Sequence, residues 1–262
     1  MKGFSGSVLK VLFVVMMAAV SCNAYAMHPL ITDDAGTQGK GKYQVEANGQ
    51  YATDNDTLNG VTTKATEGEL VTSLTYGVTE NVDAFIEFPH VWSSFKVDNV
   101  IFTNVNGLSD ISAGAKWKFF DRDGLSFAVK PSISLPTGDD KEGLGTGKTG
   151  YRMFFVAEKD VEPIGVFVNI GFIRNENTFA EEKNLWHASI AGTYEVVHDL
   201  KIAVNFGMEK NPDKTADKDP AFGLLGLVYG VRENLDVDCG IKKGLNEAEM
   251  DTTLLAGMTV RF

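Results

Sequence analysis

The C-terminal stretch from Asp251 to Phe262, DTTLLAGMTVRF, constrains the fold of this chain more than any other. Apolar or small side chains fall at every second position from Leu254 to Phe262, which predicts a strand with one apolar face. A strand that ends the chain leaves a row of unpaired backbone groups unless the first strand pairs with it. We therefore predict that this strand closes a β-barrel, because a closed barrel has no free edge.

The first expected strand, Lys42 to Ala52, alternates in the same way, with one apolar or small face and one wholly polar face. In a soluble β-sandwich the polar face meets bulk water, whereas in a membrane barrel it lines the interior. The pattern predicts an all-β fold, a closed antiparallel transmembrane barrel of about twelve strands. The other strands are expected at a segment ending at Val78 and at 82–88, 111–119, 125–135, 151–159, 164–173, 185–196, 200–209, 222–231, 235–243 and 251–262.

A short corner recurs between strands. YGVTENVD at 76–83 matches YGVRENLD at 229–236, and YEVVHDLK at 194–201 has the same spacing. These corners alternate with longer polar loops, expected at 54–60, 97–108, 136–148, 175–184, 211–219 and 245–249. Short periplasmic turns opposite longer extracellular loops are typical of outer-membrane barrels, so we favour a membrane barrel over a soluble sandwich.

The N-terminus has the pattern of a cleaved signal peptide, residues 1–26. Lys2 and Lys10 precede and flank an apolar run, and Ala24-Tyr25-Ala26 is a small-x-small cleavage site. A lipoprotein signal ending at Cys22 is the rival interpretation. Residues 27–41 have no period, and we expect them in the periplasm or tucked into the barrel mouth, ahead of the barrel at 42–262. Cleavage after Ala26 leaves one cysteine, Cys239, and therefore no intrachain disulfide.

The charge balance limits the partners. Lys and Arg total 24 against 35 Asp and Glu, which argues against a nucleic-acid partner. The mean hydropathy of -0.07 is too polar for a bundle of membrane helices. The partners we expect are instead the lipid bilayer of the outer membrane and a small-molecule solute.

Three stretches together resemble a known family. They are HPLITDDAGTQGKGKYQVE from His28, GLSDISAGAKWKF at 107–119 and PSISLPTGDDKEGLGTGK at 131–148. They resemble the outer-membrane family described as "MetA-pathway of phenol degradation". The resemblance implies a barrel in the cell outer membrane that moves small or aromatic compounds, and it carries no catalytic or binding residues. The final Phe262 also resembles the C-terminal signature of outer-membrane proteins, which implies recognition by the barrel-assembly machinery.

Two motifs suggest catalysis or phosphate binding, and both fail a simple test. The run Gly143 to Thr149, GLGTGKT, lacks the first glycine of a phosphate loop, because Glu142 stands there. His187 and Ser189 resemble the His-x-Ser pair of outer-membrane phospholipases, yet strand parity turns them inward, away from lipid. We expect no enzyme, and a hydrolase that uses this pair is a remote alternative.

Metal and cofactor chemistry has little support in the sequence. The four histidines show no ligand spacing with cysteines or carboxylates, so we expect no metal site. Asp54-Asn55-Asp56 lacks the rest of a calcium loop, including its closing glutamate. No cofactor is expected either.

Charges of both signs are expected to face the lumen. They suit either a packed, salt-bridged barrel that is structural or binds a partner, or a narrow polar conduit whose charges tune selectivity. The expected lumen-lining residues are Glu46, Asp83, Glu87, Lys116, Lys118, Lys130, Arg152, Glu158, His187, Lys201, Glu209, Asp236, Asp238, Lys242 and Arg261.

Two prolines interrupt expected strands. Pro89 and Pro131 cannot donate to a hydrogen-bond ladder, so we predict a bulge or kink at each. A kink of this kind is a hypothetical lateral gap toward lipid for apolar solutes. The leading function is a channel or transporter for passive uptake or export of a small solute, including aromatic or apolar ones.

Overall fold

The computed structural model describes residues 28–58 and 60–262. The expected signal peptide and its lipoprotein alternative lie outside these residues. The strands are β1 (Tyr43–Leu58), β2 (Val61–Thr79), β3 (Val82–Val97), β4 (Val100–Leu108), β5 (Ile111–Arg122), β6 (Leu125–Leu135), β7 (Gly150–Val161), β8 (Ile164–Arg174), β9 (Asn184–Val197), β10 (Leu200–Glu209), β11 (Ala221–Arg232), β12 (Leu235–Gly244) and β13 (Thr252–Arg261). Among the described residues, no helix is long and apolar enough to cross a membrane.

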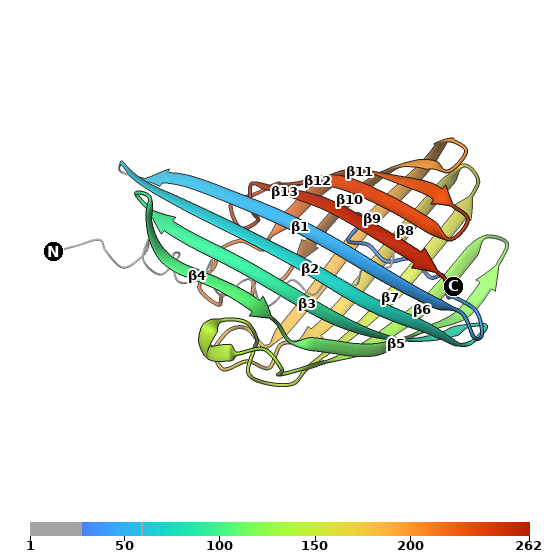
Figure 1. The fold of residues 1–262 in the computed structure, drawn as a ribbon, viewed down its shortest axis with the longest axis horizontal. Helices are drawn as coiled ribbons and strands as arrows, with labels where there is room; N and C mark the ends of the chain where they lie inside the picture. The colour runs from blue at the N-terminus through green and yellow to red at the C-terminus, as the bar shows by residue number, and fades with distance from the viewer. Residues whose placement is uncertain (1–27, 59) are drawn as a thin grey trace.

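Twelve of these strands close into an antiparallel barrel, as predicted (Figure 1). The closure is the pairing of β1 with β13, in which Tyr51 lies opposite Leu254 and Val45 opposite Val260. The remaining neighbours pair in chain order, except that β3 pairs with β5 where β4 is passed over. The strand that ends the chain therefore finds its partner in the first strand of the barrel.

The expected loop at 97–108 is wrong, because this stretch is strand β4, which forms a hairpin with β3. Asp98 and Asn99 connect the two strands with φ of 47° and 67°, the left-handed conformation that a two-residue hairpin turn requires. The expected loop at 54–60 is also too long, since Leu58 still pairs with Val61. Both hairpins extend beyond the neighbouring loops of the barrel (Figure 1), and in β4 the adjacent Ile101 and Phe102 are both exposed, so the apolar alternation is lost there.

The two faces of the wall differ as the alternation predicts. In β13, Leu254 and Met258 are 55% and 45% exposed, whereas their neighbours Thr253 and Leu255 are 1% and 4% exposed. Large apolar side chains cover the outside of the other strands in the same way, among them Phe206. An apolar exterior around a mostly polar interior is the arrangement of a membrane barrel and the reverse of a soluble protein.

Residues 28–38, which we call the internal segment, lie inside the barrel. Leu30, Thr32 and Asp33 are fully buried, and the segment leaves by the rim of short turns, where Gly41 N donates to Gly77 O at 2.8 Å. The segment is thus not in the periplasm, and it lies deeper in the lumen than the expected position at the barrel mouth. The depth of this position was not predictable, because a segment without period has no face from which to read its surroundings.

Candidate functional site: the lumen and its internal segment

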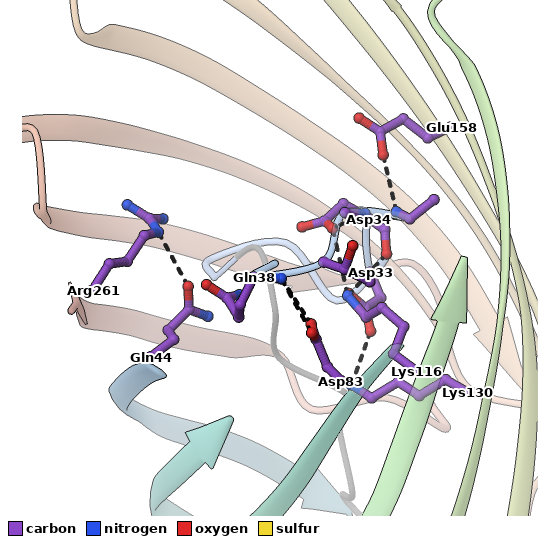
Figure 2. A network of polar contacts seen from close by, with 12 residues as sticks. Asp33, Asp34, Gln38, Gln44, Asp83, Lys116, Lys130, Glu158 and Arg261 are labelled. Atoms are coloured by element: carbon purple, nitrogen blue, oxygen red, sulfur yellow. Dashed lines mark hydrogen bonds and ion pairs between the residues drawn. The ribbon is translucent and has the colours of Figure 1, made fainter. Parts of the chain in front are cut away.

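Asp33 anchors the internal segment to the wall (Figure 2). Its Oδ1 accepts from Lys116 Nζ of β5 at 2.9 Å, and its Oδ2 accepts from Lys130 Nζ of β6 at 2.9 Å. The Asp33 side chain is 0% exposed and each lysine side chain 7%. One carboxylate thus pairs with two buried ammonium groups, which would otherwise be costly to enclose.

Further contacts tie the segment to the barrel on either side of Asp33. Ala35 N donates to Glu158 Oε2 at 2.9 Å, and Gln38 N donates to Asp83 Oδ2 at 3.0 Å (Figure 2). At the other end, His28 Nδ1 contacts Asp238 Oδ1 of β12. The wall carboxylates thus bind backbone N–H groups that have no secondary structure to satisfy them.

Two buried asparagines bind the centre of the segment as a strand would. Asn205 Oδ1 accepts from Ile31 N at 2.7 Å and Thr32 N at 3.1 Å, and its Nδ2 donates to Thr32 Oγ1 at 2.7 Å. With its amide oriented by its neighbours, Asn169 accepts from Asp33 N at 2.6 Å and donates to Asp33 O at 3.0 Å. The polar groups at the centre of the segment are therefore satisfied by the wall.

Part of the lumen wall is apolar, which the sequence analysis missed. Leu30 and Ile31 pack in a cluster with Phe167, Phe222 and Leu224 of the wall. A second cluster joins Ala35 to Phe154, Val156, Ile173 and Leu185. The alternation of β7 indicates this apolar lining, because Phe154 and Val156 lie on the same face of the strand as Arg152 and Glu158.

The expected lumen residues differ in how deeply they lie. Six are buried, namely Glu46, Asp83, Glu87, Lys116, Lys130 and His187. Eight are partly exposed, namely Lys118, Arg152, Glu158, Glu209, Asp236, Asp238, Lys242 and Arg261, and Lys201 is exposed at the short-turn rim. Wall pairs form at Arg261–Asp236 (2.7 Å) and Lys242–Glu249 (2.9 Å), but the most deeply buried pairs are those with the internal segment.

His187 and Ser189 belong to a hydrogen-bond chain that reaches the internal segment. Thr32 Oγ1 donates to Ser189 Oγ at 2.8 Å, Ser189 Oγ lies 3.0 Å from His187 Nε2, and His187 Nδ1 lies 3.2 Å from Glu209 Oε2. Glu209 was not predicted as the third member of this chain. The sequence of contacts from Ser189 to His187 to Glu209 resembles a catalytic triad, yet Ser189 is only 6% exposed and is covered by Thr32. These hydrogen bonds therefore bind the internal segment to the wall.

Polar atoms without a protein partner lie on the opposite side of the lumen. They are Glu46 Oε1, both amide atoms of Asn48, Glu67 Oε1, Ser93 Oγ and Thr253 Oγ1, all buried and all on inward faces of β1, β2, β3 and β13. A further unpartnered atom, Thr103 Oγ1, lies apart from them on β4. Buried polar groups of native proteins are nearly always satisfied, by water or a ligand where protein offers nothing. These atoms mark a polar track between the internal segment and the β1–β2 wall.

A cavity of about 110 Å³ opens on this track toward the rim of long loops. Its walls come from β1 to β3, β9 to β13 and the loops at 210–220 and 245–251, and Ile31 of the internal segment contributes to its lining. The charged and polar lining residues are Gln50, Glu67, Glu69, His187, Glu209, Lys242, Glu249 and Thr253. The space is several times what one water molecule needs.

The two prolines lie at changes in the ladder. β3 pairs with β5 as far as Glu87 and with β4 from His90, so Pro89 stands where the partner changes. Opposite Pro131, the β5–β6 pairing stops at Gly114–Ser132 and resumes at Trp117–Val129 in the same register. The register shifts in the ladders of β3 and β5 lie elsewhere, at Gly77/Thr79 of β2, Phe95/Lys96 of β3 and Lys118/Phe120 of β5. The lateral gap at these positions stays a prediction.

The stretches that carry the family resemblance meet in space. Asp33 of the first stretch pairs with Lys116 of the second. Asp110, also of the second, accepts from Gly138 N at 3.0 Å, Thr146 N at 2.8 Å and Thr146 Oγ1 at 2.9 Å of the third. The loop of the third stretch is therefore held in place by a carboxylate.

Comparison with solved structures supports an outer-membrane barrel. The fold is similar to the COG4313 outer membrane channel from Pseudomonas putida F1, with a TM-score of 0.67 and 15% identity over 87% of this chain and 98% of that one. It is also similar to the KdgM porin (TM-score 0.54, 10% identity, 84% and 99% covered). The translocator domain of the autotransporter NalP from Neisseria meningitidis gives a TM-score of 0.52 at 12% identity, with 87% and 91% covered.

No curated protein matches the chain in sequence. The sequence pattern of one family matches residues 29–262, which include every strand of the barrel and all of the internal segment except His28. At identities this low, the solved structures show the fold alone. The family match, together with the contacts among its three characteristic stretches, shows that this chain belongs to the family described as "Putative MetA-pathway of phenol degradation".

Proposed function

We propose that this protein is an outer-membrane channel through which a small solute passes passively, beside the internal segment and along β1, β2 and β13. The observation that carries the proposal is the row of buried polar atoms without a protein partner on that side of the lumen. The internal segment is hydrogen-bonded mainly to the other side, through Lys116, Lys130, Asn169 and Asn205. A solute or water chain on the free side would satisfy what the protein leaves unpaired.

The alternative is a structural or partner-binding barrel with a packed lumen. The fully buried Asp33 and its two lysines favour it, because a closed network of this kind makes part of the lumen solid. The unpartnered track argues for passage, and the similar structures are described as a channel and a porin rather than as enzymes. We therefore propose no enzymatic activity.

Conductance of the purified full chain in planar bilayers separates passage from packing. Small, steady current steps and swelling of liposomes in solutes such as sugars, amino acids and aromatic acids are expected of the channel. A reconstituted, folded barrel with neither steps nor swelling would establish the packed alternative. Heat-modifiable migration on a gel checks that the barrel has folded in both assays.

The route to the membrane is part of the proposal. We infer that residues 1–26 are a signal peptide removed after Ala26, and that Phe262 is recognised by the barrel-assembly machinery. N-terminal sequencing of the protein purified from outer membranes should begin at Met27, and a modified Cys22 would instead support the lipoprotein signal. Removal of Phe262 should lower the amount of folded barrel in the membrane.

A further inference from the structure

We propose that the cavity at the long-loop end of the lumen binds the head group of an organic ammonium ion, so that the solute is a small organic cation. This inference rests on the proposed channel function and names the class of solute for it. The cavity has two sides of different chemistry, one of carboxylates and one apolar, as the following contacts show.

One row of register partners forms the polar side. Ala52 of β1 lies opposite Glu67 of β2 on one side and Thr253 of β13 on the other, and Thr253 lies opposite Lys242 of β12. All four side chains point into the lumen. The methyl group of Ala52 is the smallest in the row, so it leaves space between the carboxylate of Glu67 and the hydroxyl of Thr253.

Hydrogen-bond acceptors in this row have no partner. Thr253 Oγ1 is unpartnered although the residue is 1% exposed, and Glu67 Oε1 is unpartnered as well. Ser93 Oγ, on the register partner of Glu67, is a third such atom. An ammonium group carries three donors and no acceptor, so it complements a carboxylate and hydroxyls that lack donors.

The charges around the cavity favour a cation. Four carboxylates line it, from Glu67, Glu69, Glu209 and Glu249, against the ammonium of Lys242 and the imidazole of His187. Lys242 is paired with Glu249 at 2.9 Å and His187 with Glu209 at 3.2 Å. Within the described part of the chain, the carboxyl groups of Glu67 and Glu69 have no such basic partner and are left to attract a cation. A cleft lined by one sign of charge concentrates solutes of the opposite sign.

The other side of the cavity is apolar and favours an organic cation over a metal ion. Phe222, Pro212, Pro220 and Met250 line it, and they offer surface for a hydrocarbon body. Among the described residues, no group of three or more His, Cys, Asp and Glu side chains could hold a metal ion. The carboxylates are thus too dispersed for a divalent cation.

The contacts of Lys242 show how this site binds an ammonium group. Its Nζ lies 5.4 Å from the centre of the Phe222 ring while Glu249 accepts from it, which combines a cation–π contact with an ion pair. A solute ammonium beside Glu67 would find a comparable pairing of carboxylate and apolar surface across the cavity. The lining loops at 210–220 and 245–251 place this site at the end where a solute from outside first enters.

Block of the ion current tests the proposal with three matched probes: benzylammonium, benzyl alcohol and benzoate. They share a ring and differ in charge, so a site for organic cations should give block by benzylammonium alone. Glu67→Gln should raise the concentration for half-block about tenfold, since it removes one charged partner from a partly buried contact. Thr253→Val, which keeps the shape of the buried side chain, should weaken block severalfold.

Glu195→Gln is the matched control, because it removes one carboxylate near the short-turn rim, outside the cavity lining, and should leave block unchanged. Equal block by all three probes, or unchanged block in both cavity variants, would overturn the site. If the wild-type barrel carries no current, the channel proposal fails. Calorimetric titration of the detergent-solubilised full chain with benzylammonium then decides the site alone: heat that Glu67→Gln abolishes supports it, and no heat refutes it.

Discussion

Lys116 Nζ lies 2.9 Å from Asp33 Oδ1 inside the barrel, although the two residues are 83 positions apart in the chain. Lys130 Nζ lies at the same distance from the other carboxylate oxygen. This pairing joins a segment that is not part of the sheet to two neighbouring strands of it. These three side chains are therefore part of what holds the internal segment against one side of the lumen.

Asp33→Asn should release the internal segment and raise the conductance. The substitution leaves Lys116 and Lys130 enclosed without a carboxylate between them, and breaking a buried pair in this way costs about 3–5 kcal/mol. The single-channel current measures the result. Asp34→Asn is the control, since Asp34 Oδ1 lies 3.4 Å from Lys116 and its side chain is 19% exposed, and it should change the current little. Equal currents in wild type and Asp33→Asn would show that the segment does not limit passage.

Asp110→Ala should detach the loop at 136–149 from the barrel. The carboxylate accepts three hydrogen bonds from Gly138 and Thr146, and their loss should cost at least about 2 kcal/mol. Trypsin cleavage after Lys141 should then become roughly 30-fold faster. Asp139→Ala removes only one local bond, to Lys141 N, and serves as the comparison. If the two variants are cleaved at the same rate, Asp110 does not hold the loop.

The loop after β8 should loosen in acid. Hydrogen bonds from Lys183 and Arg174 hold the pKa of the Glu176 carboxyl below its usual 4.5. Because the folded pKa is lowered, this contact stabilises the loop above pH 4.5, and the contribution is lost as the pH falls through the folded value. Amide exchange of residues 175–183 should rise in that range. Lys183→Gln should move the pKa of Glu176 back toward 4.5, and an unchanged titration would contradict the assignment.

Pro131→Val tests whether solutes leave through the wall. Valine has the N–H that proline lacks, so the β5–β6 ladder is able to pair through residues 115 and 131. If apolar solutes pass laterally there, their flux should fall severalfold while that of sugars is unchanged. Pro89→Val is the companion variant at the point where β3 changes partner. Unaltered apolar flux in both variants would remove the lateral route.

Most barrel strands were predictable to within a few residues, because alternation shows directly which face meets lipid. The exceptions are β1 and β3, which run on to Leu58 and Val97, past their expected ends at 52 and 88. The strand at Leu200–Glu209 has the predicted bounds. Prediction failed where that contrast disappears, as in β4, where the adjacent Ile101 and Phe102 are both exposed. Asp98-Asn99 was nevertheless a usable turn signal. Phe154 and Val156 were missed for a different reason: apolar side chains were assumed to face lipid, yet here they pack against the internal segment.

The sequence by itself determined the strands, their two faces, the closure of β13 on β1 and the family, because each follows from local periodicity or from a contiguous motif. Only the tertiary structure decided that residues 28–38 fill one side of the lumen, that Asp33 lies between Lys116 and Lys130, and that Glu67 and Thr253 share a cavity. These relationships join residues on strands distant in the chain. They follow from the register between neighbouring strands around the barrel and from which interior groups find a partner. No local sequence pattern encodes the register or the partners.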